Sequence, residues 1–298
     1  ARGANNKGAE ESFVASTAVR ASVHGDVVHS RPVAINFGDD TLDGRKIVVF
    51  YGANDGILRA VNGNRGDVGD VEVGKIGSVN AGAELWSFVA PETYSALSRL
   101  RENTLPIKFK GSATGTPKQY GIDGPITAYQ SGDSTWIFTA MRRGGRAVYA
   151  FDVSDIATDP DSPTLKWKAG CDDSGCSSGF SDIGQTWSTP IPIAKVGPDA
   201  KPMLIMGGGY DPCEDEDEPS GTTCTAADNG NGIYLLDADT GEFVSVFPTS
   251  RPVVGDVVVI TDDNTGLPKW VYAADLGGNV YRISQAGGVN GSPRSRTF

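Results

Sequence analysis

Apolar residues in this chain come in short runs that polar turn residues interrupt. The clearest case is residues 47–61, where IVVFYGA is followed by Asn54-Asp55-Gly56 and then by ILRAV. Asn, Asp and Gly favour turns and left-handed backbone, so a helix through this stretch would be unfavourable. The pattern therefore predicts a tight β-hairpin with strands at residues 47–53 and 57–61.

The same order of apolar strand, small-residue turn and second strand recurs along the chain. It is found again at residues 145–170, 230–247 and 269–284, and GAELWSF at residues 82–88 adds a strand to the first unit. Each unit is too small to bury its own apolar face, so the units must stack against one another. A β-propeller meets this need while keeping strand edges short, and roughly four blades are readable.

Three aromatic residues, Trp86, Trp167 and Phe243, stand near the start of the last strand of their units. We expect them to be equivalent packing residues between blades. One helix is predicted at residues 90–103, because Pro91 falls in the first turn and Tyr94, Leu97 and Leu100 share one face. Long insertions, expected to be loops, are residues 62–81, 155–162 and 211–229.

The expected fold is therefore all-β, a β-propeller with one inserted short helix. Residues 1–20 are expected to be an N-terminal extension and residues 21–298 the propeller domain. The 39 glycines and 17 prolines suit many turns, and the 298 residues suffice for one large all-β domain or two ordinary ones. The chain starts with Ala1 and not with methionine, which we interpret as a processed start that is compatible with export.

Charge and hydropathy argue against nucleic-acid binding and against a membrane-spanning helix. The net charge of -11 argues against general nucleic-acid binding, because Arg142, Arg143 and Arg146 are too few to form a basic face. No apolar run reaches the roughly 20 residues that a membrane-spanning helix needs. The sequence also lacks a nucleophile elbow, a P-loop, a dinucleotide fingerprint and an HExxH motif, so no catalytic residues are predicted.

The four cysteines form two local pairs, Cys171 with Cys176 and Cys213 with Cys224. Close, even pairing in loops rich in Asp, Gly and Ser favours two disulfides and an oxidising compartment. Free thiols and a zinc site are the alternatives. Zinc would need further ligands, and the only two histidines, His24 and His29, are far away in sequence, so neither is expected to be a ligand or a base.

Two short motifs are candidate binding sites. Asp262, Asp263 and Asn264, followed by Gly266, offer the oxygen ligands and the turn that calcium prefers, although a plain β-turn explains the same residues. Arg65-Gly66-Asp67 is an integrin-type tripeptide on an expected loop, and in a chain rich in Gly and Asp it also arises by chance.

The acidic run at residues 213–219 is interpreted as a solvated loop, with a weak calcium site as the alternative. Residues 182–187 match D-x-G-x-T-W, most of the Asp-box motif of other propellers. In that motif the Asp and Thr tie a hairpin turn and the Trp packs between strands, so the match supports a propeller and not a catalytic role.

Taken together and in order, five segments resemble the C-terminal β-propeller of the PilC/PilY family of type IV pilus proteins. They are HGDVVHSRPVAINFG from residue 24, VVFYGANDGILRAVNG from residue 48, RRGGRAVYAFDVSD from residue 142, GQTWSTPIPI from residue 184 and VYAADLGGNVYRI from residue 271. The resemblance spans roughly residues 20–285, and it implies a modified quinoprotein-like propeller.

The resemblance implies a non-enzymatic module of pilus assembly, which opposes retraction and serves adhesion. It places the protein at the pilus tip or outer cell surface, with minor pilins or other tip components and a host or abiotic surface receptor as partners. No cofactor is expected except calcium. The family's calcium loop would fall on residues 261–269, where Thr261, Thr265 and Lys269 replace acidic positions, and Arg59 replaces a histidine that the family often has.

Two alternatives remain open at this point. One is a quinone-dependent dehydrogenase on the same fold, which would need a disulfide between adjacent cysteines, and the chain has no such pair. The other is a periplasmic assembly scaffold built from the same repeats. The resemblance also implies a propeller longer than this chain, with further blades or a partner covering an exposed edge.

Overall fold

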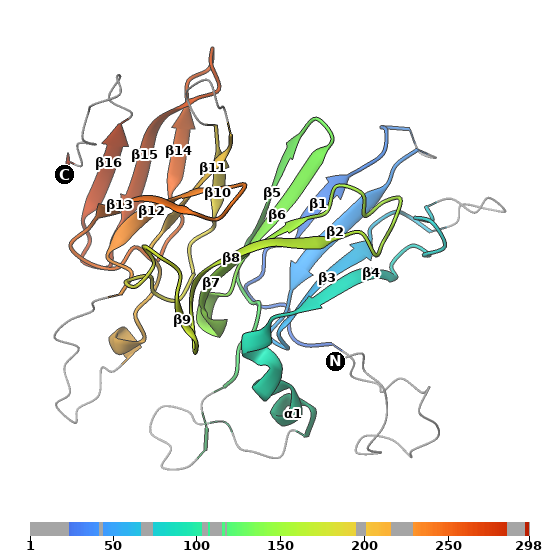
Figure 1. Cartoon of the computed structure of the whole chain (residues 1–298), viewed down its shortest axis with the longest axis horizontal. Coiled ribbons are helices and arrows are strands. Elements are labelled where there is room, and N and C mark those ends of the chain that lie inside the picture. The colour runs from blue at the N-terminus through green and yellow to red at the C-terminus, as the bar shows by residue number, and fades with distance from the viewer. Residues whose placement is uncertain are drawn as a thin grey trace.

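Four antiparallel sheets follow one another along the chain. This computed structural model describes residues 24–41, 44–66, 74–102, 107, 115–116, 118–194, 201–215, 229–284 and 296–297. Each sheet keeps its strands in chain order, so every neighbouring pair is an antiparallel hairpin or meander. Figure 1 shows the sheets side by side as an open fan, from β1–β4 on one side to β14–β16 on the other.

We call the sheets blades 1 to 4. Blade 1 contains β1 (Val33–Asn36), β2 (Ile47–Gly52), β3 (Ile57–Asn62) and β4 (Glu84–Val89). Blade 2 contains β5 (Ile126–Ser131), β6 (Ser134–Ala140), β7 (Arg146–Asp152), β8 (Thr164–Asp172) and β9 (Gly175–Cys176). Blade 3 contains β10 (Ile191–Ile193), β11 (Met203–Gly207), β12 (Gly232–Asp237) and β13 (Phe243–Pro248). Blade 4 contains β14 (Val258–Thr261), β15 (Pro268–Ala274), β16 (Val280–Ser284) and β17 (Arg296–Thr297).

The hairpin predicted from residues 47–61 is present as β2 and β3. Gly56 takes a φ of 85°, which a residue with a side chain rarely adopts, and its N–H donates to the carbonyl of Ala53 at 3.1 Å. The polar residues of the turn also bind the segment before blade 1. Gly25 N–H donates to Asp55 and Asp26 N–H donates to Asn54, both at 2.9 Å. The turn therefore holds a second segment as well as reversing the chain.

Apolar side chains fill the spaces between consecutive blades. One core lies between blades 1 and 2, a second between blades 2 and 3, and a third between blades 3 and 4. Trp167 belongs to the second core, and its Nε1–H donates to the carbonyl of Ala238 in blade 3 at 3.1 Å. Trp86 packs edge-on against Phe151 of blade 2, with ring centroids 5.2 Å apart. Both tryptophans therefore lie between blades, as predicted.

The predicted equivalence of Phe243 with these tryptophans is wrong. Trp86 is paired with Ala60, and Trp167 with Ala150, while the corresponding partner in blade 3, Leu235, is paired with Ser245. Each of these three blades has a register shift next to this pair, and the extra residue of the bulge turns the side chains beyond it to the other face. Phe243 therefore faces the preceding blade, and packs on Phe180 and Tyr234.

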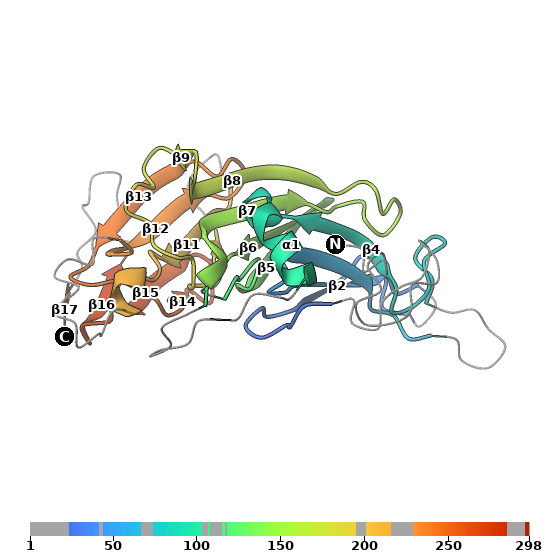
Figure 2. The same ribbon diagram turned by 90° about the horizontal axis from the view of Figure 1, so that it is seen from below.

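The predicted helix is present as a short turn, η1 (Pro91–Thr93), followed by α1 (Tyr94–Glu102). Its buried face is not the predicted one, because Tyr94 and Leu100 are exposed whereas Thr93 and Ala96 are buried. Glu92 attaches this segment to blade 2, since its carboxylate accepts a hydrogen bond from Tyr149 and pairs with Lys168. The helix lies along the lower side of the fan in Figure 1 and faces the viewer in Figure 2.

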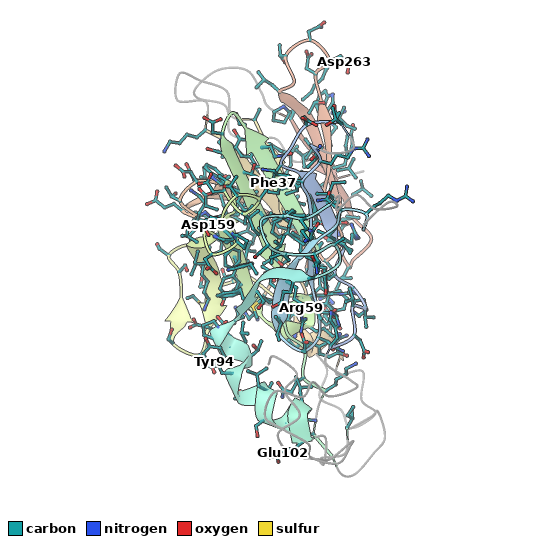
Figure 3. All side chains as sticks on the ribbon, turned by 90° about the vertical axis from the view of Figure 1, so that its right-hand side faces the viewer. Phe37, Arg59, Tyr94, Glu102, Asp159 and Asp263 are labelled. Carbon is teal, nitrogen blue, oxygen red and sulfur yellow. A yellow bond between two sulfur atoms is a disulfide. The ribbon has the colours of Figure 1, made fainter. Side chains whose placement is uncertain are left out.

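Two further short helical turns complete the described elements: η2 (Arg142–Gly144), between β6 and β7, and η3 (Pro212–Asp215), after β11. Figure 3 shows the hairpin tip with Asp263 at one end of the molecule and the last residue of α1, Glu102, at the other.

Candidate functional site

Polar residues gather where the first strand of each blade begins. The segments that precede β1, β5, β10 and β14 all line one pocket with a volume of about 240 Å³. The strands themselves also meet here, because β5 contacts both β1 and β10. We call the polar and aromatic residues that meet here the axial cluster: His29, Arg31, Asp123, Arg142, Arg143, Trp187, Thr189, Tyr210 and Asp256.

A buried carboxylate holds the first and second blades together in the axial cluster. The side chain of Asp123 is 1% exposed, and its Oδ2 lies 2.6 Å from Nδ1 of His29. The backbone N–H of His29 donates to the other oxygen of the same carboxylate at 3.3 Å. Burying a carboxylate is unfavourable unless it is hydrogen-bonded, so His29 stabilises Asp123 and links the two segments.

A second carboxylate, that of Asp256, joins three blades. Its Oδ2 accepts a hydrogen bond from Nη1 of Arg31 at 2.6 Å, and its Oδ1 accepts one from the backbone N–H of Thr189 at 2.8 Å. Burial acts to raise the pKa of Asp256, but the hydrogen bonds from Thr189 and Arg31 outweigh it and lower the pKa. Asp256 is therefore held as a carboxylate between blades 1, 3 and 4.

Cationic and aromatic side chains stack on one side of the axial cluster. The guanidinium of Arg142 lies 4.2 Å from the ring centroid of Trp187, and that of Arg143 lies 4.9 Å from it. Arg143 also lies 5.5 Å from the ring of Tyr210, which packs on Trp187 with centroids 4.9 Å apart. Such cation–π contacts are favourable and leave the edge of a guanidinium available for hydrogen bonds.

The sequence did not indicate the axial cluster. Trp187 was predicted to pack between strands as part of an Asp-box, but its segment links blades 2 and 3, and its ring lies in the axial pocket. Only Thr186 has the tying role expected of the motif, because its hydroxyl accepts from Met141 N–H and donates to the carbonyl of Ala147, both at 2.9 Å. The detectable signal was a repeated small residue, since Ser30 and Ser188 each accept the N–H of a glycine at the end of the second strand of their blade, at 2.9 Å.

The candidate adhesion tripeptide lies on the predicted loop after β3. Arg65 and Gly66 are exposed, and Asp67 lies outside the described residues. The base of the loop is fixed, because Nδ2 of Asn62 donates to the carbonyls of Gly74 and Val79 at 2.7 and 2.9 Å. A fixed base with exposed residues beyond it is a suitable arrangement for a binding loop.

The candidate calcium residues form the turn between β14 and β15. Oδ1 of Asp262 accepts hydrogen bonds from the N–H groups of Asn264 and Thr265, at 3.0 and 3.1 Å, and Gly266 N–H donates to its carbonyl at 2.8 Å. These bonds lower the pKa of Asp262. Asp263 and Asn264 are exposed.

The turn after β12 is built in the same way. There Oδ1 of Asp237 accepts the N–H groups of Asp239 and Thr240, and Gly241 N–H donates to the carbonyl of Asp237. The two sequences, DADTG and DDNTG, thus make one kind of hairpin turn. In the described part of the chain, no group of three or more His, Cys, Asp or Glu residues could hold a metal ion.

A disulfide joins Cys171 to Cys176 at the junction of β8 and β9, as the spacing predicts. Cys213 is also disulfide-bonded, and its predicted partner Cys224 lies outside the described residues. The insertion at residues 211–229 is fixed at its base. The carboxylate of Asp211 accepts the N–H groups of Cys213 and Asn229 at 3.0 and 3.1 Å.

Both histidines, which were not expected to be ligands or bases, make specific contacts with neighbouring segments. His29 pairs with Asp123, as described above. His24 stacks on Tyr51, with centroids 5.4 Å apart, and its Nε2 lies 2.9 Å from the tyrosine hydroxyl. Among the described helices, none has the length and apolar character needed to span a membrane.

Antiparallel blades whose first strands meet at a common axis define this chain as a β-propeller type of protein. A comparison with protein families agrees, because the model of the PilY1 β-propeller domain matches residues 35–297. The chain therefore belongs to the PilY1 β-propeller family, as its resemblance to the PilC/PilY proteins implied.

Several named relatives extend well beyond this chain. The type IV pilus biogenesis factor PilY1 of Pseudomonas aeruginosa is 25% identical over 307 residues, which cover 93% of this chain and 22% of the relative. A PilY1 homologue of Xylella fastidiosa is 26% identical over 292 residues, covering 89% of this chain and 20% of the relative. The crystal structure of the P. aeruginosa PilY1 C-terminal domain aligns with a TM-score of 0.49 and 21% identity, over 82% of this chain and 40% of that one. The chain thus spans about a fifth of the length of these curated relatives.

Proposed function

We propose that this chain is a non-enzymatic module of type IV pilus assembly, which opposes pilus retraction and contributes to adhesion at the pilus tip or cell surface. The observation that carries the proposal is the family match over residues 35–297, together with relatives described as type IV pilus biogenesis factors. Its partners are minor pilins or other tip components, and a receptor on a host or abiotic surface.

The described architecture supports a role in binding. The blades are fixed to one another by buried apolar cores and by the axial hydrogen bonds, and further hydrogen bonds fix the bases of the two long insertions. Loops on a rigid frame are the usual place for contacts with partners. We therefore assign pilus and surface contacts to the insertions at residues 62–81 and 211–229, with Arg65, Gly66 and Asp67 as the adhesion candidate.

The experiment is to delete the gene of the full-length protein and count surface pili by electron microscopy. We expect few or no pili in the deletion strain and restoration by the full-length protein. Unchanged pili in the deletion strain would contradict the assembly role. Attachment of the piliated strain to cells and to glass, with and without Asp67→Ala, then tests adhesion separately. We expect this substitution to lower attachment and leave the pilus number unchanged, with Asp70→Ala as the control in the same loop.

The alternative of a quinone-dependent dehydrogenase makes a different prediction. Under that alternative, addition of a quinone cofactor and an alcohol to the full-length protein would reduce an electron-accepting dye. We expect no dye reduction above that of a heat-denatured sample. Sustained reduction would replace the assembly proposal with an enzymatic one.

A further inference from the structure

Arg142 has an unusual backbone conformation. Its φ is 53°, and among the described residues it is the only one other than glycine with a positive φ. A side chain at such a φ is strained, and strain of this kind is kept where the surroundings or a function require it. Hydrogen bonds hold the backbone in place, because the N–H of Arg142 donates to Thr186 at 3.0 Å and its carbonyl accepts from Gly145 at 3.3 Å.

The strained backbone presents the Arg142 guanidinium to the axial pocket. This side chain lines the pocket together with those of His29, Arg31 and Trp187. The central carbon of its guanidinium lies over the ring of Trp187, 4.2 Å from the ring centroid. Within the part of the chain that the structure describes, no residue accepts a hydrogen bond from this guanidinium, although it carries five N–H donors in a planar fork.

The aspartates in and beside the pocket, Asp256 and Asp123, already have partners. Asp123 is paired with His29, and Asp256 accepts hydrogen bonds from Arg31 and Thr189. The cations Arg143 and Arg31 both act on the Arg142 guanidinium by repulsion. A negative charge beside this guanidinium would therefore be favourable.

The pKa of Arg142 also indicates that a negative charge nearby would stabilise its guanidinium. Burial lowers the pKa of Arg142, because the guanidinium loses contact with water, and Arg143 and Arg31 lower it further by repulsion. Asp123 acts in the opposite direction. An anion beside the fork would offset both the lost hydration and the repulsion.

We propose that the axial pocket binds a small oxyanion, a carboxylate or a phosphate group, through the guanidinium fork of Arg142. The fork pairs with two oxygens of such a group in a bidentate manner, while Trp187 fixes the plane of the guanidinium. Arg31 and His29 also line the pocket and add positive charge or hydrogen-bond donors. A pocket of about 240 Å³ has room for roughly eight water molecules, so the ligand is a small molecule or a single side-chain or terminal carboxylate.

Calorimetric titration of the full-length protein with succinate and with inorganic phosphate, at constant ionic strength in sodium chloride, tests the proposal. We expect saturable binding of at least one of the two. Saturation by succinate alone identifies a carboxylate ligand, and saturation by phosphate alone identifies a phosphate ligand. No saturable binding of either anion would overturn the proposal.

Two variants assign the binding to Arg142. Arg142→Gly removes the fork and also relieves the strained φ, so the variant should fold and should unfold at an unchanged or higher temperature without anion. We expect its affinity for the anion to fall at least tenfold, and that of Arg142→Lys, which keeps the charge but not the fork, to fall as well.

Arg282→Lys is the matched control, because the Arg282 guanidinium lies 4.5 Å from the ring of Trp270, outside the pocket, and this change should leave anion affinity unaltered. Wild-type affinity in Arg142→Gly would overturn the proposal. None of these outcomes depends on pilus assembly, so the proposed function can fail without affecting this test.

Discussion

Nη1 of Arg31 lies 2.6 Å from Oδ2 of Asp256, although 225 positions separate the two residues in the sequence. The pair joins the segment before blade 1 to the segment before blade 4, so the outer blades of the fan are connected at its axis. Both groups are partly exposed, with 68% of the Arg31 side chain and 31% of the Asp256 side chain accessible. Water screens such a pair, and its contribution to stability is accordingly small.

Replacement of Arg31 by alanine tests this connection. At pH 7 we expect the free energy of unfolding to fall by about 0.2–1 kcal/mol, the range of exposed ion pairs. The folded state lowers the pKa of Asp256, so the stability that the carboxylate contributes is present above its unfolded pKa, near 4, and is lost as the pH falls through the lower folded value. Urea unfolding should therefore show a difference between wild type and variant at pH 7 that shrinks below about pH 4. A difference that grows at low pH would contradict this account.

Trp167 tests the packing of blade 2 on blade 3. Trp167→Ala removes a large buried side chain and should lower the free energy of unfolding by about 3–5 kcal/mol. Trp167→Phe keeps most of the volume but leaves the carbonyl of Ala238 without its donor, which should cost about 1–3 kcal/mol. Trp270→Phe, at a half-buried position of β15, is the control and should cost less than about 1 kcal/mol. Chemical denaturation measures all three, and an equal effect at Trp167 and Trp270 would refute the predicted interface.

Asp275 organises the turn of the last hairpin. Its carboxylate accepts the N–H groups of Gly277 and Asn279 at 2.9 and 3.0 Å, and the hydroxyl of Tyr281 at 2.8 Å, while the residue is only 7% exposed. An amide in its place presents N–H donors to these donors. Asp275→Asn should therefore lower the free energy of unfolding by about 1–3 kcal/mol.

The matched control for Asp275 is Asp262→Asn, because Asp262 also caps a hairpin turn of blade 4 but is more exposed. Exposed hydrogen bonds are replaced by water at little cost, so we expect a smaller loss of stability than for Asp275→Asn. Thermal unfolding followed by circular dichroism compares the two. If Asp262→Asn is the more destabilising change, the assigned importance of burial is wrong.

The turn at residues 261–266 gives a prediction about calcium. Because Asp262 already accepts the N–H groups of its own turn, and Asp263 and Asn264 alone offer few further oxygens, we expect no tight calcium site here. Calorimetric titration of the full-length protein with calcium should give the same result for wild type and for Asp263→Ala. A strong signal that disappears in Asp263→Ala would establish the site.

Features that depend on neighbouring residues were predictable from the sequence. Asn54-Asp55-Gly56 specifies its own turn, because the required positive φ falls on a glycine, and the disulfide at Cys171 and Cys176 follows from close spacing. Features that depend on how the strands pair with one another were not predictable from the sequence. A bulge places Phe243 on the face opposite to that of Trp167, and no local pattern marks the inserted residue.

The axial cluster could be predicted least of all, because its contacts join segments of different blades. Asp123 meets His29, and Asp256 meets Arg31, only after several blades have formed and brought their first strands together. Each of these residues, taken alone in the sequence, is an ordinary polar residue of a loop. The strained Arg142 is likewise invisible in the sequence, since arginine gives no indication of a positive φ.

The central claim is that the blades form a frame and that the insertions make the contacts with the pilus. The most direct measurement is the binding of the full-length protein to purified type IV pili by surface plasmon resonance. The variant replaces residues 67–73 and 216–223 with Gly-Ser sequences of equal length, which retains all four cysteines. The account predicts that the variant unfolds at the wild-type temperature and loses most of its affinity for pili. Undiminished affinity in the folded variant would contradict it.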